Sequence, residues 1–250
     1  MTSIPHLRAW SKSPKNLCIP DEIPAYWKAH DMLTFLADTG MYDASLEQGL
    51  DAAEKERALQ LKSDYFRQRF AVSRSLLKSI LRYLPGTGNN NDIVLSQEKK
   101  RILVKGRQDF HISLSYSGTS LALSVGKRKI GIDMEIVHPV DLRKIRSSPL
   151  FDCSICRDNN EESLHTLHAW TLVEAYAKLR DTNPFPLLSG TTFFPDAGFA
   201  SYCIDEQAVL SLAWDPGQIK ETLLWIDPHT FSRGEPFSSS PLGGDTYVRS

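Results

Sequence analysis

Hydrophobic residues recur every three or four positions between Leu46 and Leu84. This spacing gives one apolar face and predicts a long amphipathic helix. The helix is expected to end at Pro85-Gly86, because proline cannot continue the hydrogen-bond ladder. A shorter helix is predicted from Pro24 to Leu36, and residues 1–20, which hold three prolines, are expected to form an irregular lead-in.

In the middle of the chain the period changes to two. Apolar residues alternate with small or polar ones in three successive segments, 111–115, 121–125 and 130–136, separated by glycine turns. This pattern predicts three strands in an antiparallel meander. A second helix is predicted from Glu161 to Leu179, ending before Asn183-Pro184. Further strands are predicted at Thr191–Phe194, Gly198–Ile204, Val209–Trp214 and Thr222–Ile226.

Helices and strands occur in both halves of the chain, which predicts an α+β fold with two lobes of similar size. The expected boundaries are 1–20 for the lead-in, 21–126 for the N-terminal lobe, 127–227 for the C-terminal lobe and 228–250 for a flexible tail rich in Pro, Gly and Ser. Two lobes in one chain make a monomer sufficient.

Composition narrows the function classes. The 250 residues carry a net charge of -1, so neither nucleic acid nor an acidic membrane is an expected partner. No apolar run is long enough to span a bilayer, and Met1–Pro20 lacks the apolar core of a signal peptide. Four cysteines are too few for a disulfide framework in a chain of this length, which favours a reducing cytoplasm.

Two carboxylates are predicted on one face of a strand. Alternation along 130–136 turns Asp133 and Glu135 away from the four apolar side chains, with Gly131 leaving space beside them. A hard cation such as Mg²⁺ would relieve the repulsion between the carboxylates, and magnesium often recruits substrate phosphates. The alternative is the solvated face of an edge strand.

Glu174 and Lys178 are four residues apart on the second long helix and therefore share a face. Glu174 is a candidate third metal ligand or general base, and Lys178 is a candidate for neutralising phosphate charge. Two structural alternatives stay open: a capping box formed by Thr171 and Glu174, and a helical Glu174–Lys178 salt bridge.

The first half of the chain is basic. Residues 52–83 hold eight basic and three acidic residues, a net charge of +5. A second basic cluster lies in residues 99–107. A basic lobe facing carboxylates suits a metal-bridged polyphosphate, although long basic side chains also cover ordinary helix surfaces. The second cluster consists of Lys99, Lys100, Arg101, Lys105 and Arg107.

Two other motifs are disfavoured. Cys153, Cys156, His165 and His168 have a shorter central gap than a zinc finger, and no hairpin is predicted before them. The serines of segment 113–117 lack the glycine pattern of a hydrolase nucleophile.

The order and spacing of three stretches resemble the surfactin-synthetase type of 4′-phosphopantetheinyl transferase. The stretches are Leu50–Arg57 with Arg69-Phe70 and Arg74–Leu77, then Phe110–Gly118, and finally Gly131–Glu135 with Trp170–Lys178. The resemblance implies a pseudo-dimer of two α+β lobes with coenzyme A between them. It implies transfer of phosphopantetheine from coenzyme A to a serine of an acyl or peptidyl carrier protein, releasing 3′,5′-ADP.

The resemblance also implies residue roles. Asp133, Glu135 and Glu174 would hold Mg²⁺, or Mn²⁺ as an alternative, in the C-terminal lobe. Glu174 and Lys178 would be catalytic, Glu174 taking the serine proton and Lys178 neutralising the diphosphate. The coenzyme would be bound through the N-terminal lobe by Arg74, Ser115, Tyr116 and Lys100.

Several positions depart from the family pattern. Tyr116 stands where the family has histidine and Val173 where it has lysine, so replacing Val173 by lysine is expected not to harm the rate. Lys99-Lys-Arg101 replaces a Gly-Lys-Pro segment, and the glycines expected after Lys178 are missing. Two alternative functions therefore remain: a non-catalytic relative that binds coenzyme A or carriers, and a metal-dependent phosphoesterase.

Overall fold

The computed structural model describes residues 6–13, 16–41, 44–86, 93–98, 101–137, 159–189 and 194–227. The predicted tail, 228–250, lies outside these residues. The helices are η2 (Pro20–Glu22), α1 (Ile23–Ala29), η3 (Thr39–Met41), η4 (Ala44–Gly49), α2 (Ala52–Leu59), α3 (Asp64–Arg82), α5 (Asn159–Arg180) and α6 (Pro184–Leu187). The strands are β1 (Leu7–Trp10), β2 (Met32–Asp38), β3 (Leu95–Glu98), β4 (Arg101–Val104), β5 (Arg107–Ser117), β6 (Ser120–Gly126), β7 (Ile130–Ile136), β8 (Gly198–Ile204), β9 (Ala208–Trp214) and β10 (Glu221–Trp225).

The strands form two sheets. A six-stranded sheet has the order β10-β2-β6-β5-β4-β3, and a four-stranded sheet has the order β1-β8-β9-β7. Antiparallel pairs predominate; β1–β8 and β10–β2 are parallel. This mixed architecture agrees with the predicted α+β class, whereas the pseudo-dimer arrangement stays a prediction. The first and last strands each pair in the sheet formed mainly by the opposite half of the chain. Strand β1 lies in the four-stranded sheet, and β10 lies in the six-stranded sheet.

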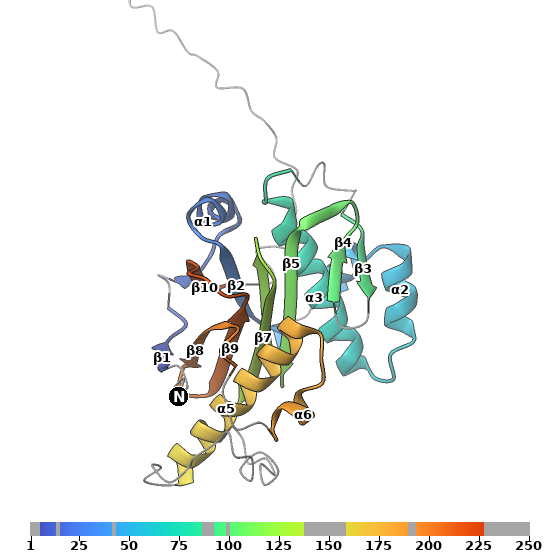
Figure 1. Cartoon of the computed structure of the whole chain (residues 1–250). Coiled ribbons are helices and arrows are strands. Elements are labelled where there is room, and N and C mark those ends of the chain that lie inside the picture. The colour runs from blue at the N-terminus through green and yellow to red at the C-terminus, as the bar shows by residue number, and fades with distance from the viewer. Residues whose placement is uncertain are drawn as a thin grey trace, which may run out of the picture.

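Buried apolar side chains form two main clusters, one on each face of the six-stranded sheet. Apolar side chains of α3 pack on one face of the six-stranded sheet, where Leu33, Phe35 and Leu123 are buried. The opposite face meets the four-stranded sheet in a second cluster that includes Met32, Ile132 and Leu212. Helix α5 covers the outer face of β7 and β9 (Figure 1). The two sheets are therefore held together by buried apolar surface, the main favourable term in folding.

The long helix predicted over 46–84 is divided in the structure. Helix α2 begins with a capping box, in which the Asp51 side chain accepts from the Glu54 backbone and Glu54 accepts from the Asp51 backbone. Helix α3 begins at a Ser63 N-cap. Lys78 of α3 forms ion pairs with Asp51 and Glu54, which ties the start of α2 to the middle of α3. Asp51 and Ser63 each accept a backbone N–H group that the first turn of a helix leaves unpaired.

Several predicted elements differ from the structure. Residues 32–36 form β2 instead of the end of a helix, because this central strand is buried on both faces and its continuous apolar run suits that position. Strand β7 does not continue the meander after β6; it pairs with β9 in the other sheet. Within the lead-in, Leu7–Trp10 form β1 through pairing with β8. Strands β3 and β4 were not predicted, and of the expected strand at 191–194 only Phe194 lies within the described residues.

None of the helices in the described part of the chain combines the length and apolar character needed to cross a bilayer.

Candidate active site

Three serines of β5 join the two sheets. Alternation along β5 directs Phe110 and Ile112 into the α3 core, so Ser113, Ser115 and Ser117 face the other way. There they meet the open edge of β7 and accept its backbone N–H groups. Ile132 donates to Ser113 at 3.0 Å, Met134 donates to Ser115 at 3.2 Å, and Ile136 donates to Ser117 at 2.9 Å. Serine hydroxyls thus replace the strand partner that β7 lacks on this edge.

Gly131 allows α5 to lie directly on β7. A Cβ at this position would lie 2.5 Å from the backbone nitrogen of Leu179 and would also meet the carbonyl oxygen of Ala175. About one turn before Ala175, the Thr171 hydroxyl lies 2.7 Å from the Ser211 hydroxyl of β9. The space predicted beside the carboxylates is therefore filled by the backbone of α5. Since α5 begins at Asn159, Thr171 is an interior residue, and the capping-box alternative is wrong.

Close packing of α5 brings Lys178 onto Asp133. The Lys178 ammonium donates to Asp133 Oδ1 at 2.8 Å, to the Ser115 hydroxyl at 3.2 Å and to the Leu114 carbonyl at 3.3 Å. The Ser115 hydroxyl donates to the same Asp133 oxygen at 2.8 Å. Asp133 is 4% exposed, so the alternative of a solvated strand face is wrong for this carboxylate.

The other carboxylate of β7 is held in a similar way. Glu135 Oε2 accepts the Ser117 hydroxyl at 2.7 Å and is partly exposed. Glu174 lies one turn before Lys178, on the same face of α5. The structure thus places Asp133, Glu135 and Lys178 together at the junction of the two sheets, with Glu174 on the helix face that carries Lys178.

Two of the three predicted metal ligands, Asp133 and Glu135, are placed so that they could bind a hard divalent cation. Asp133 and Glu135 offer only oxygen ligands, as Mg²⁺ prefers. Asp133 Oδ2 is buried and accepts no hydrogen bond from the described residues, a costly state that a cation would relieve. Among the described residues, no group of three or more His, Cys, Asp or Glu side chains forms a metal cluster. Glu174 as the third ligand therefore stays a prediction.

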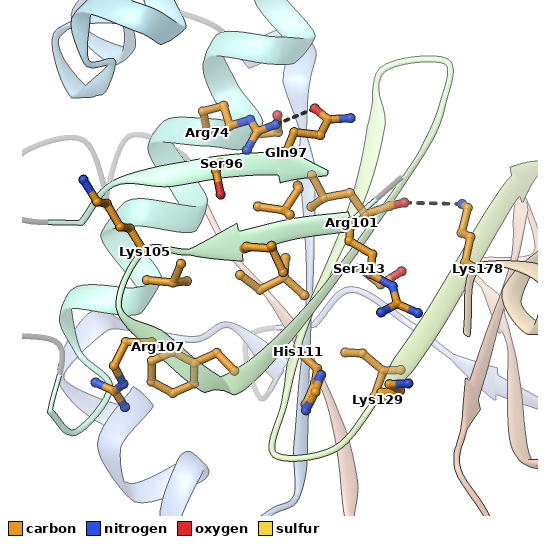
Figure 2. Close-up of a pocket in the computed structure, with 18 of the residues that line it drawn as sticks. Arg74, Ser96, Gln97, Arg101, Lys105, Arg107, His111, Ser113, Lys129 and Lys178 are labelled. Carbon is orange, nitrogen blue, oxygen red and sulfur yellow. Dashed lines mark hydrogen bonds between the residues drawn. The ribbon is translucent and has the colours of Figure 1, made fainter. Parts of the chain in front are cut away.

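A cationic pocket of about 1000 Å³ opens beside this junction. Its wall contains six lysines and arginines and, among the described residues, no Asp or Glu. Strands β3–β5 and α3 supply one side, while the β6–β7 turn and the end of α5 supply the other. Figure 2 shows the labelled polar side chains around a group of apolar ones, with Lys178 at the right-hand side of the pocket. The basic residues are Arg74, Arg101, Lys105, Arg107, Lys129 and Lys178.

Two predicted coenzyme-binding residues line this pocket. Arg74 is buried and donates to Gln97 at 2.9 Å, and burial lowers the pKa of its guanidinium. Tyr116 lies under the Arg69 guanidinium, whose Cζ is 4.3 Å from the ring centroid. Burial raises the pKa of Tyr116, so its hydroxyl stays protonated. Arg69 therefore brings to Tyr116 the positive charge that tyrosine itself lacks.

Sequence analysis missed part of the pocket. Lys129 was not singled out, although it ends the basic run Lys127-Arg128-Lys129, because only folding carries this turn to the pocket beside β5. There His111 lies near Lys129, and burial together with the Lys129 charge lowers the pKa of His111. Ser117 was considered only as a hydrolase nucleophile. Its alternation with Ser113 and Ser115 could have indicated that the three hydroxyls share one face of β5.

The remaining predicted residues take other positions. Ser115 does not contribute to the described pocket wall; it is buried between Asp133 and Lys178. Val173 is 0% exposed and packs in an apolar cluster with Leu188 and Phe194. Lys100 lies outside the described residues, as do Cys153 and Cys156 of the disfavoured zinc motif.

Comparison with known proteins shows a distant similarity over part of the chain. The chain is 23% identical over 115 residues to the 4′-phosphopantetheinyl transferase psf-1 of Bacillus pumilus. The match covers 45% of this chain and 49% of the relative, so the chain spans about half the length of the curated protein it matches. No family model matches. The similarity is therefore distant and partial, and it does not single out the surfactin-synthetase type.

Proposed function

We propose that this protein is a Mg²⁺-dependent 4′-phosphopantetheinyl transferase, which moves phosphopantetheine from coenzyme A to a serine hydroxyl of an acyl or peptidyl carrier protein. The observation that carries the proposal is the cationic pocket whose inner residue, Lys178, holds a buried carboxylate of β7. Coenzyme A carries a diphosphate and a 3′-phosphate. The described wall of the pocket contains six basic residues and no Asp or Glu, which suits such a polyanion.

The residues have complementary roles in this reaction. Lys178 neutralises the diphosphate of coenzyme A, while Asp133 and Glu135, with Glu174, hold the cation. When bound, Mg²⁺ masks phosphate charge and stabilises the leaving 3′,5′-ADP. Arg74 and Tyr116 bind the nucleotide side of the coenzyme.

The transfer replaces the phosphoanhydride bond of coenzyme A by a phosphoester bond to the carrier. The carrier serine oxygen forms a bond to the phosphorus that carries pantetheine, and the bond from that phosphorus to the oxygen of 3′,5′-ADP breaks. Glu174 accepts the serine proton, directly or through water. A positioned base of this kind contributes about 10²–10⁴-fold to the rate.

A carrier-loading assay tests the proposal. The protein is incubated with coenzyme A, Mg²⁺ and several apo-carriers, and the carrier mass is measured. The expected result is a gain of one phosphopantetheine, which Asp133→Ala and Glu174→Ala abolish while circular dichroism shows retained folding. Absence of any mass gain across the carriers would overturn the proposal.

A second candidate is a non-catalytic relative that binds coenzyme A. Its support is that Asp133 is engaged by Lys178 and that the described residues form no three-ligand metal cluster. Calorimetry separates the two, because coenzyme A binding without transfer to any carrier would favour the second candidate.

A further inference from the structure

Two serine hydroxyls of β5 each join a backbone amide and a carboxylate of β7. Ser115 accepts from Met134 N and donates to Asp133 Oδ1, while Ser117 accepts from Ile136 N and donates to Glu135 Oε2. In both cases the amide belongs to the residue that follows the carboxylate. The repeat arises because β5 and β7 run side by side with side chains in a period of two.

We infer that Ser115 and Ser117 are positioning residues, which hold the carboxylates of Asp133 and Glu135 in the orientation that a divalent cation requires. The inference rests on the proposed function, since it concerns the cation site of that reaction. In this role Ser117 orients Glu135, and Ser115 contacts Asp133 instead of the coenzyme.

The hydrogen-bonding capacity of Ser115 supports this assignment. A serine hydroxyl has one proton to donate and two lone pairs to accept with. Ser115 accepts from the Met134 amide at 3.2 Å and from the Lys178 ammonium at 3.2 Å, and it donates to Asp133 at 2.8 Å. All three positions are filled, so no proton remains for a coenzyme phosphate.

Burial and hydrogen bonds also restrain the two serine hydroxyls. Ser115 and Ser117 are both buried, at 5% and 6% exposure, and each amide hydrogen bond fixes the position of its hydroxyl oxygen. A carboxylate that accepts from such a hydroxyl loses rotational freedom before any ligand arrives. Residues that hydrogen-bond to metal ligands in this way typically change metal affinity by about 10–100-fold when they are removed.

The chain contains its own matched control. Ser113 makes the same amide contact, with Ile132 N at 3.0 Å, and is buried at 8% exposure. The residue before Ile132 is Gly131, so the equivalent position carries no carboxylate. Ser113→Ala therefore removes the same contact between the sheets without removing a hydrogen bond to Asp133 or Glu135.

The experiment measures Mn²⁺ binding to the full chain by calorimetry and electron paramagnetic resonance. Ser115→Ala and Ser117→Ala are expected to weaken binding about tenfold, and Ser113→Ala to leave it unchanged. Urea unfolding of all three variants measures the structural effect separately. In transfer assays the same two variants should raise the Mn²⁺ concentration for half-maximal rate, with KM for coenzyme A nearly constant.

Equal Mn²⁺ affinities in the wild type and all variants would overturn the inference. An equal loss of affinity in all three variants would overturn it as well, because the serines would then only hold β5 and β7 together. If the wild type binds no Mn²⁺, the proposed cation site fails. Crystal structures of Ser115→Ala and Ser117→Ala then decide the positioning role, which is lost if Asp133 and Glu135 keep their orientations.

Discussion

The ammonium of Lys178 lies 2.8 Å from Asp133 Oδ1, with side-chain exposures of 24% and 6%. The same carboxylate is a proposed cation ligand, and the same ammonium faces the proposed diphosphate pocket. Lys178 therefore competes with a cation for Asp133. A bound diphosphate would attract the Lys178 ammonium away from Asp133 and leave this carboxylate to the cation. Since coupling between ligands is reciprocal, coenzyme A and the cation should strengthen each other's binding.

Lys178→Met tests this coupling. The variant should bind Mn²⁺ more tightly than the wild type in the absence of coenzyme A, because the competing charge is gone. Coenzyme A should raise Mn²⁺ affinity in the wild type by about 5–150-fold, the usual range of such coupling, and much less in the variant. Calorimetric titrations with and without coenzyme A measure both effects, and equal coupling in the two proteins would contradict the prediction.

The pocket cations should determine affinity for coenzyme A. Neither Lys105 nor Lys129 forms an ion pair with a carboxylate in the described part of the chain, so both charges are available to a ligand. Lys105→Ala and Lys129→Ala should each weaken coenzyme A binding about tenfold, the effect of one charge-assisted hydrogen bond of ~1.4 kcal/mol. Lys28→Ala, an exposed lysine of α1, is the control. Unchanged calorimetric affinity in both pocket variants would remove these lysines from the site.

Replacing Val173 by lysine should destabilise the protein. The resemblance of the sequence to the transferase family implied that Val173→Lys is tolerated, but Val173 is fully buried against Leu188 and Phe194. An unpaired ammonium there must be neutralised or exposed, and buried unpaired charge costs several kcal/mol. We expect a loss of about 3 kcal/mol in unfolding free energy, measured by urea titration. Val173→Leu, an apolar substitution, provides the comparison, and equal stability of the two variants would contradict the burial argument.

Gly131→Ala should separate α5 from β7. The added methyl meets backbone atoms of Ala175 and Leu179, so truncating a side chain cannot relieve it. Overpacking of this kind costs about 1–3 kcal/mol, and transfer should fall further because Lys178 moves with the helix. The measurement combines thermal unfolding with the carrier-loading rate. A second substitution, Leu179→Ala, should fail to restore either quantity; rescue would show that side-chain crowding was the cause.

Stability should fall in mild acid because of His168. This side chain is buried, its Nε2 has no hydrogen-bond partner among the described residues, and burial, with a smaller effect of His165, lowers its pKa from 6.5 to about 4. Between these values the unfolded state binds more protons, so unfolding free energy decreases as pH falls from 6.5 to 4, by about 3 kcal/mol in all. Below pH 4 both states are protonated and this loss stops.

His168→Leu should remove most of that pH dependence, and His165→Leu, at a partly exposed position, should retain it. Urea unfolding at pH 7, 6, 5 and 4 measures the slope in each variant. The same slope in wild type and His168→Leu would assign the acid sensitivity to other groups.

The sequence determined the elements with strong periodicity. Strand β7 was predicted at the residues where it occurs, α5 was predicted to within two residues, and the carboxylates of β7 were recognised because alternation along a strand is a local property. The basic character of the first half was equally visible and corresponds to one wall of the pocket.

Long-range pairing decided what the sequence could not. Residues 32–36 are a strand because the centre of a sheet offers them two apolar faces, and β7 leaves β6 because β9 provides a backbone partner. The meeting of Lys178 with Asp133, the burial of Val173 and the arrival of Lys129 at the pocket all depend on how α5 and the turns pack. Local patterns report which face a side chain takes, whereas tertiary packing decides what that face meets.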